Sequence, residues 1–320
     1  MRIISSMKFL IICYLLVFSN IILSQSQGKY TIVIHGGAGY IPADIIQNVK
    51  DAYLQALSDA LNIGRKILES GGTSLDAVEQ VIRFFEDDSI FNAGKGAVFT
   101  AEGTHELDAS IMNGKDLSCG AVAGVKTIKN PISLSRLVME KTPHVLFTGE
   151  GAYKLGKKFG VDIVNNHYFD VVKRYEQWKK KHDENVKGTV GCVAIDEYGN
   201  IAAGTSTGGL TDKWAGRVGD SPLINAGTYA NNKTCGVSAT GEGEQFIRNT
   251  VSFNISALME YKGLTLEDAA NEMIFNRLPK DSGGIIAVDN NYNYTLKFNT
   301  SSMFRGVATS DGIFEVKIWK

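Results

Sequence analysis

The sequence contains little proline, little cysteine and no excess of charge of either sign. Its 320 residues include five prolines and four cysteines, and 33 lysines and arginines balance 34 aspartates and glutamates. The length allows one large domain or two ordinary ones, and the prolines form no linker. A net charge of −1 gives no general electrostatic reason to bind nucleic acid or an anionic membrane. A hydrophobic content of 44% is typical of a soluble globular protein rather than a disordered chain.

The N-terminal residues 1–24 have the pattern of a secretory signal peptide. Arg2 and Lys8 provide a basic start, and residues 9–23 form an apolar run that is short for a membrane span. We expect cleavage between residues 24 and 27, and a secreted, periplasmic or lysosomal protein with no membrane contact after the signal is removed. The alternative is an uncleaved membrane anchor.

The cysteines do not form a disulfide framework. Cys13 lies inside the predicted signal peptide, which leaves Cys119, Cys192 and Cys235, an odd number. Each of the three stands among small and apolar residues. We therefore expect them to be small hydrophobic side chains of the core.

The order of apolar patterns indicates an α+β fold. Thr73 and Asp76 resemble a capping box that opens a helix, and Asn130 with Pro131 resembles a second helix start. Strands are predicted at about 29–35, 106–112, 117–125, 189–196, 200–207 and 233–240, with four more after 284; helices are predicted at about 45–70, 73–85, 170–181, 243–261 and 265–278. Because strands and helices do not alternate strictly, we expect sheets packed on each other and covered by helices, not a doubly wound sheet.

Several familiar motifs fail on inspection. Gly37 and Gly39 follow a strand, but Pro42 stands where a dinucleotide-binding loop needs its third glycine. The segment from Gly151 to Lys157 resembles a phosphate-binding loop weakly, because Lys158 replaces the hydroxyl residue that would hold magnesium. The histidines and cysteines show no metal-ligand spacing.

The stretch that carries chemistry begins at Gly188 and Thr189, directly after a charged connector at 182–188 and at the start of a strand. A threonine hydroxyl is a weak nucleophile unless a base lies beside it. If the chain is cut before Thr189, its freed α-amino group becomes that base. Threonine is also a common strand residue, so this motif alone leaves both interpretations open.

The wider context resembles the plant-type L-asparaginase and isoaspartyl peptidase family, whose members are N-terminal nucleophile hydrolases. The resemblance rests on separated motifs that occur in the family's order: H-G-G-A-G from His35, F-N-A-G-K-G from Phe91, T-S-T-G-G from Thr205, G-R-V-G-D-S-P from Gly216 and A-T-G-E-G from Ala239. It covers roughly residue 29 to the end. It implies a four-layer αββα sandwich with no organic cofactor.

The resemblance also implies roles for individual residues. Self-cleavage between Gly188 and Thr189 would divide the chain into an α subunit, 25–188, and a β subunit, 189–320, with Thr189 as the nucleophile. The Thr207 hydroxyl would orient the nucleophile. Arg217 would bind the substrate α-carboxylate, and Asp220 would accept the substrate α-ammonium group. Thr240 and Gly241 would form the oxyanion hole, and Asn92 would assist processing. From the residues alone, Arg217 and Asp220 could instead form a surface ion pair.

The same resemblance implies a sodium ion and a dimer. The ion would be held by the backbone carbonyls of Phe85, Glu86, Asp88, Phe91, Ala93 and Lys95, and the assembly would be a homodimer of cleaved αβ units. The expected reaction is hydrolysis of β-aspartyl amide bonds in isoaspartyl dipeptides and L-asparagine. The alternatives are a glycosylasparaginase, which acts on glycosylated asparagine, and a secreted binding protein that keeps the fold without cleaving.

Overall fold

A computed structural model describes residues 28–42, 44–180 and 188–320. The predicted signal peptide and most of the predicted connector lie outside the described residues. Within the ranges that the structure covers, no helix combines the length and the apolar character that crossing a membrane requires.

The larger sheet gathers strands from both ends of the chain. In the described part of the chain it has eight strands in the order β12-β11-β1-β5-β6-β2-β3-β4. Their bounds are β1 Thr31–Gly39, β2 Leu107–Asn113, β3 Cys119–Val125, β4 Leu146–Thr148, β5 Val190–Ile195, β6 Ile201–Thr207, β11 Ser302–Thr309 and β12 Phe314–Trp319. Strand β5, which begins one residue after Thr189, lies between β1 and β6 in the middle of this sheet.

The smaller sheet consists of β10-β9-β8-β7 among the described residues. These strands are β7 Thr228–Ala230, β8 Cys235–Gly241, β9 Gly283–Asp289 and β10 Tyr294–Phe298. Apolar side chains such as Val193 and Ile201 from the larger sheet pack against Ile286 and Val288 from the smaller one. The two sheets therefore lie face to face.

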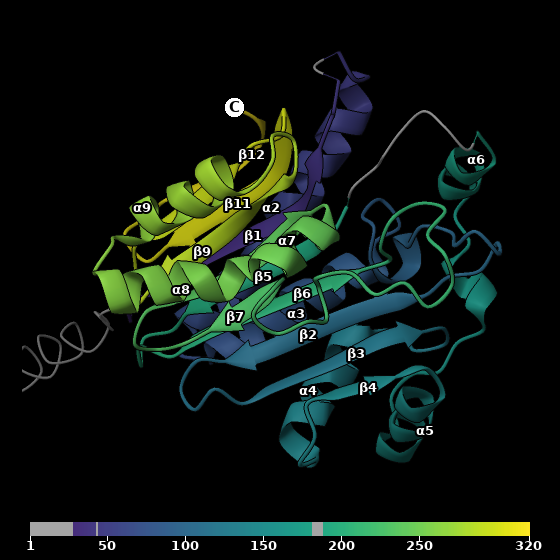
Figure 1. The fold of residues 1–320 in the computed structure, drawn as a ribbon, viewed down its shortest axis with the longest axis horizontal. Coiled ribbons are helices and arrows are strands. Elements are labelled where there is room, and N and C mark those ends of the chain that lie inside the picture. The colour runs from purple at the N-terminus through teal and green to yellow at the C-terminus, as the bar shows by residue number, and fades with distance from the viewer. Residues whose placement is uncertain (1–27, 43, 181–187) are drawn as a thin grey trace, which may run out of the picture.

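Helices cover both outer faces and complete four layers (Figure 1). On the larger sheet these are α2 Gln47–Glu69, α3 Ser74–Asp87 and α4 Pro131–Lys141; on the smaller sheet they are α7 Gly243–Asn249, α8 Val251–Lys262, α9 Leu266–Asn271 and a π-helical turn, Glu272–Arg277. Leu57 and Ile82 share one apolar cluster with Ile32 of the larger sheet, whereas Phe246 and Ile255 share another with Val237 of the smaller sheet. The predicted αββα sandwich is confirmed.

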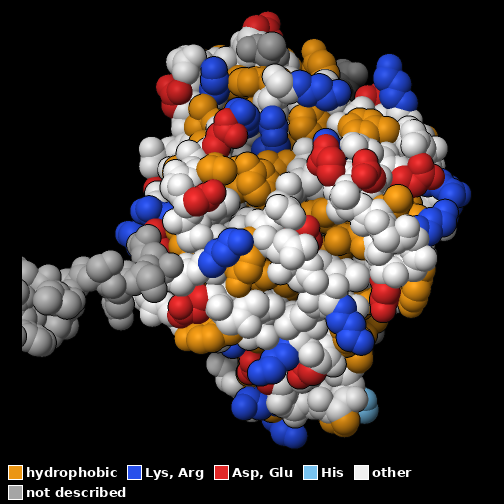
Figure 2. Space-filling view, turned by 90° about the vertical axis from the view of Figure 1, so that its left-hand side faces the viewer, with side chains coloured by type: hydrophobic (Ala, Val, Ile, Leu, Met, Phe, Trp, Pro, Cys, Tyr) orange, Lys and Arg blue, Asp and Glu red, His pale blue; other side chains and the backbone are white. Residues whose placement is uncertain are grey.

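The remaining helices lie at the margin of the larger sheet. Helix α5, Gly149–Phe159, follows edge strand β4, and α6, Val172–Lys180, follows a short 3₁₀ turn, Asn166–Phe169. The weak phosphate-loop motif at Gly151 therefore forms part of a helix. On the face drawn in Figure 2, basic and acidic side chains are interspersed, in agreement with the near-zero net charge.

Local signals predicted some helix ends correctly and missed others. Thr73 caps α3 by accepting a hydrogen bond from the Asp76 amide, as predicted. Helix α4 begins at Pro131 as predicted, although the Asn130 side chain donates to Asp87 instead of capping it. The prediction of one helix over 243–261 is wrong, because the chain turns at Thr250, where φ is 45°.

Contacts with a distant loop explain this break. Beyond the turn, the Ser252 amide and hydroxyl both donate to the Ala226 carbonyl, and the Phe253 amide donates to the Asn225 carbonyl. The strands β4 and β7 were also missed, because each has only three residues. Cys119, Cys192 and Cys235 are free, as predicted; Cys192 and Cys235 are buried, whereas Cys119 is only half-buried.

Truncation of a core residue on α2 tests the helix-to-sheet packing. Leu57 is fully buried, whereas Val49 on the same helix is exposed. We expect Leu57→Ala to lower the free energy of unfolding by about 2–5 kcal/mol, because it removes buried apolar contacts and leaves a cavity. Val49→Ala is the control and should change it by no more than about 0.5 kcal/mol. Urea titration followed by circular dichroism measures both, and equal effects would contradict this packing.

Candidate active site

Two neighbouring strand ends bring the predicted nucleophile and its orienting hydroxyl together. Thr189 stands just before β5, and Thr207 is the last residue of β6. The two central strands pair antiparallel, with Val190 opposite Ser206, so the two threonines meet where β5 begins and β6 ends. The Thr189 hydroxyl donates to Thr207 Oγ1 at 3.2 Å, and both side chains are buried.

The carbonyl oxygen of Gly188 accepts two side-chain hydrogen bonds. Asn92 Nδ2 donates to it at 2.7 Å, and the Thr207 hydroxyl donates to it at 3.1 Å. Thr207 Oγ1 in turn accepts from the Gly209 amide at 2.9 Å. Successive hydrogen bonds therefore connect the Thr189 hydroxyl, through the Thr207 hydroxyl, to the Gly188 carbonyl. Fixed donors of this kind stabilise negative charge that develops on a carbonyl oxygen.

A pocket of about 10 Å³, enough for about one water molecule, lies beside Thr189. Its lining combines the predicted nucleophile and substrate-binding residues, and consists of Gly188, Thr189, Thr207, Gly209, Leu210, Arg217, Gly219, Asp220, Ser221 and Gly241. Thr240 is fully buried behind this lining, where its hydroxyl accepts from the Ala38 amide at 3.3 Å. Most of the predicted site residues thus surround one small space.

Arg217 is held by a residue that sequence reasoning missed. Its Nε and Nη2 atoms each donate to one carboxylate oxygen of Glu244 at 2.9 Å, and Glu244 lies in the first turn of α7. This planar, bidentate contact fixes the guanidinium beside the pocket. Arg217 keeps the pKa of Glu244 below its ordinary value. The only sequence signal was that Glu244 follows the A-T-G-E-G motif.

Asp220 does not form an ion pair with Arg217 among the described contacts. It is 5% exposed, and within the described chain its Oδ2 atom has no hydrogen-bond partner. Burial raises the pKa of Asp220 to about 7. A buried carboxylate with an unpaired oxygen is costly unless a cation binds beside it. The surface ion-pair interpretation of Arg217 and Asp220 is therefore wrong, and the geometry suits binding of an ammonium group.

His35 contacts the backbone of the predicted nucleophile, Thr189. Its Nδ1 lies 2.9 Å from the Thr189 carbonyl oxygen, which can only accept, so Nδ1 carries the hydrogen. Burial lowers the pKa of His35 to about 3, so the ring is neutral and Nε2 accepts from the Ser238 hydroxyl at 3.0 Å. Gly191 lies against this contact, where a Cβ would overlap both Ser238 Oγ and His35 Nε2. The H-G-G-A-G motif was noted in the sequence, but no role for His35 was predicted.

The predicted metal loop begins in the last turn of α3, which contains Phe85 and Glu86, and its later part carries Asn92 to the site. Gly94 and Gly96 approach the backbone closely, and a Cβ on them would overlap the carbonyl oxygens of Glu86 and Phe91 respectively. The backbone of this turn is therefore closely packed. The Glu86 side chain points elsewhere, because its Oε1 accepts from the Ser206 hydroxyl at 2.7 Å, and burial raises the pKa of this carboxyl to about 8.

An added methyl group at Gly191 tests the contact between His35 and Ser238. Because the Cβ of Gly191→Ala would overlap both partners, we expect the variant to cost about 1–3 kcal/mol of stability. Gly151→Ala is the matched control, since its Cβ would meet only Phe147 at 3.8 Å. Thermal unfolding of both variants measures the difference. An unfolding temperature of Gly191→Ala equal to the wild type would contradict the described packing.

Comparison with known proteins gives the same family as the motifs. The model of the asparaginase family matches residues 28–318. An isoaspartyl peptidase of Salmonella typhimurium is 48% identical over 87% of this chain and 95% of its own length. A probable isoaspartyl peptidase/L-asparaginase 2 of Arabidopsis thaliana is 44% identical over 92% and 100%, and an isoaspartyl peptidase/L-asparaginase of Mus musculus is 41% identical over 85% and 86%. The chain belongs to the asparaginase family.

Proposed function

We propose that this chain is an isoaspartyl peptidase and L-asparaginase that matures by cutting itself between Gly188 and Thr189. The observation that carries the proposal is the position of the Thr189 hydroxyl, which lies against Thr207 in the pocket that Arg217 and Asp220 line. The printed names of the relatives support the activity and the class of substrate.

Self-cleavage uses the contacts on the Gly188 carbonyl. The Thr189 oxygen attacks the carbonyl carbon of Gly188 while its proton passes toward the departing nitrogen of Thr189. The peptide C–N bond breaks and an ester forms, and Asn92 and Thr207 stabilise the negative oxygen between these states. Water then hydrolyses the ester, which leaves a carboxylate on Gly188 and a free amine and hydroxyl on Thr189.

Hydrolysis of substrate repeats this chemistry with a new base. The freed α-amino group of Thr189, with an ordinary pKa of about 7.7–8.0, takes the proton of its own hydroxyl. The oxygen attacks the β-carbonyl carbon of the substrate, and ammonia or an amine leaves with that proton. Water then cleaves the β-aspartyl ester and restores Thr189.

The charges in the pocket select an α-amino acid. Arg217 binds the substrate α-carboxylate and is oriented by Glu244, while the unpaired oxygen of Asp220 accepts the α-ammonium group. The backbone amide of Gly241, with Thr240 beside it, serves the developing oxyanion. A substrate held at both α-groups presents its β-carbonyl to Thr189.

We also propose that a sodium ion binds between the last turn of α3 and Lys95. Backbone carbonyls are oxygen donors, which hard cations prefer, and those of Glu86 and Phe91 lie close to Gly94 and Gly96. The proposed ligands are the backbone carbonyls of Phe85, Glu86, Asp88, Phe91, Ala93 and Lys95. A bound ion would neutralise the carbonyl dipoles there, and the loop itself positions Asn92 against Gly188.

The proposal also includes the oligomeric state of the protein and its cellular location. We infer a homodimer of cleaved αβ units, from the family resemblance, and a secreted, periplasmic or lysosomal protein, from the predicted signal peptide. The family match begins at residue 28, so the predicted signal peptide precedes it.

Substitution of the nucleophile tests the activity. We expect Thr189→Ala to lower the hydrolysis of L-asparagine and of an isoaspartyl dipeptide by more than about a thousandfold, because no hydroxyl remains to attack. Thr189→Ser is the matched control and should retain part of both activities. Ammonia and amino-acid release measure the rates. Full activity of the alanine variant would contradict the proposal, and activity confined to glycosylated asparagine would favour a glycosylasparaginase.

The raised pKa of Asp220 predicts how substrate affinity depends on pH. Below about pH 7 the Asp220 carboxyl becomes protonated and loses its attraction for the substrate ammonium. We therefore expect KM for L-asparagine to rise as pH falls, with a limiting slope of about tenfold per pH unit. Asp220→Asn should have a high KM that no longer changes with pH in this range. A wild-type KM that stays constant between pH 8 and about pH 5.5 would contradict this role.

A further inference from the structure

A second network, away from the substrate pocket, holds the asparagine that binds the Gly188 carbonyl. Asn92 uses its whole amide group: Nδ2 donates to the carbonyls of Gly188 and Gly209, both at 2.7 Å, and Oδ1 accepts from the Val98 amide at 3.0 Å. A flipped amide would place its oxygen against two carbonyl oxygens. The Val98 amide therefore sets the orientation that directs Nδ2 toward Gly188.

Val98 is held in turn by His105, through its carbonyl group. His105 Nδ1 lies 3.1 Å from the Val98 carbonyl oxygen and donates to it, since a carbonyl can only accept. The imidazole is fully buried and packs against Phe99, with ring centroids 4.1 Å apart. Its other nitrogen, Nε2, lies 3.0 Å from Asp170 Oδ1.

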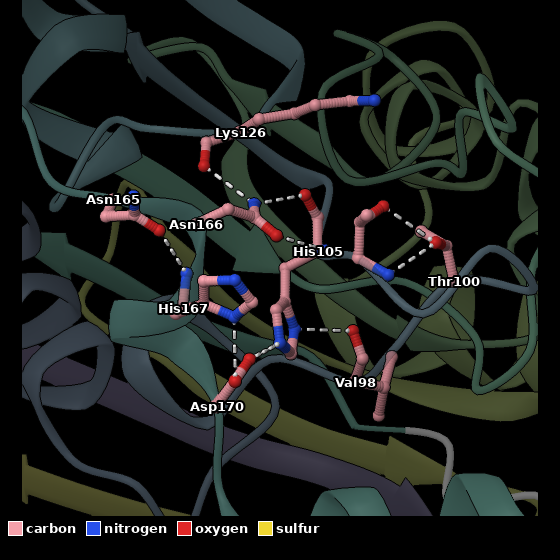
Figure 3. A network of polar contacts seen from close by, with 9 residues as sticks. Val98, Thr100, His105, Lys126, Asn165, Asn166, His167 and Asp170 are labelled. Atoms are coloured by element: carbon pink, nitrogen blue, oxygen red, sulfur yellow. Dashed lines mark hydrogen bonds and ion pairs between the residues drawn. The ribbon is translucent and has the colours of Figure 1, made fainter.

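Asp170 links this buried ring to the surface. Figure 3 shows its carboxylate between two imidazole rings, with Oδ2 of Asp170 3.0 Å from His167 Nδ1. His167 is 84% exposed, whereas the Asp170 side chain is 47% exposed. Asn166 adds a backbone clamp, because it accepts from the His105 amide and donates to the His105 carbonyl. The network thus joins the turn before α6 to the loop that carries Asn92.

We propose that His105 and Asp170 are positioning residues for self-cleavage, acting through Val98 and Asn92 on the scissile carbonyl of Gly188. The inference rests on the self-cleavage proposed above. Asp170 orients the His105 ring so that Nδ1 faces Val98. With its carbonyl held by His105, Val98 presents the amide of its preceding peptide group to Asn92, and Asn92 donates to Gly188. Neither His105 nor Asp170 lines the substrate pocket, so their effect falls on maturation rather than on hydrolysis.

Two substitutions of similar size at Asp170 separate positioning from packing. The amide oxygen of Asp170→Asn can accept from His105 Nε2 as the carboxylate oxygen does, while its Nδ2 donates to the exposed His167 ring, so this variant keeps the network. The apolar side chain of Asp170→Leu has a similar size and removes both contacts. We expect Asp170→Leu to slow self-cleavage about tenfold, the usual consequence of losing an orienting hydrogen bond, and Asp170→Asn to stay within about twofold of the wild type.

Two further variants change the two histidines that contact Asp170. His105→Phe retains a ring beside Phe99 but cannot donate to Val98, and should slow self-cleavage by about tenfold or more. His167→Ala removes only the exposed partner of Asp170 and is the matched control, with an unchanged rate. If His105→Phe fails to fold by circular dichroism, the comparison of Asp170→Leu with Asp170→Asn still decides the question.

Pulse-labelled cell-free translation, followed by gel electrophoresis over time, measures the rate at which each full chain divides. The kcat and KM of the cleaved fraction provide the second readout and should stay within about twofold of the wild type for all four variants. If the wild type divides and Asp170→Leu divides equally fast, or if Asp170→Asn is as slow as Asp170→Leu, the positioning role is overturned. If the wild type never divides, the proposed self-cleavage itself fails.

Discussion

The hydrogen bonds on one oxygen atom, the carbonyl oxygen of Gly188, constrain much of the surrounding structure. Two residues from separate parts of the sequence donate to it: Asn92, which follows α3, and Thr207, at the end of β6. Hydrogen bonds fall off steeply with distance and angle, so each donor must be held within a few tenths of an ångström. The sheet pairing, the loop after α3 and the buried polar networks all serve this requirement.

The sandwich fold holds the groups of the site at these short distances because several of them stand on rigid strands or at strand ends. The pairing of β5 with β6 brings Thr189 to Thr207, and the pairing of β1 with β5 brings His35 to the Thr189 carbonyl. The proposed substrate-binding side chains, Arg217 and Asp220, lie on a loop instead. That loop is tied to the smaller sheet's helix layer through Glu244. The hydroxyl of the proposed nucleophile is therefore held by strands, and the charges proposed to select a substrate lie on a loop that Glu244 holds.

Sequence motifs predicted the members of the site but not their supports. Thr189, Thr207, Arg217, Asp220 and Gly241 stand in glycine-rich motifs, and the structure places all of them around one pocket. No role was predicted for Glu244, His105 or Asp170, because their roles depend on partners 27 to 65 positions away. The break at Thr250 was missed for the same reason, since contacts with the distant residues Asn225 and Ala226 override a continuous helical pattern.

The most direct test of the account is the covalent state of the folded protein. The purified chain should be denatured, and its intact mass and N-terminal sequences determined. We expect two polypeptides, one of which begins Thr189-Val190-Gly191-Cys192. A folded chain that hydrolyses isoaspartyl dipeptides while the bond between Gly188 and Thr189 stays intact would contradict it.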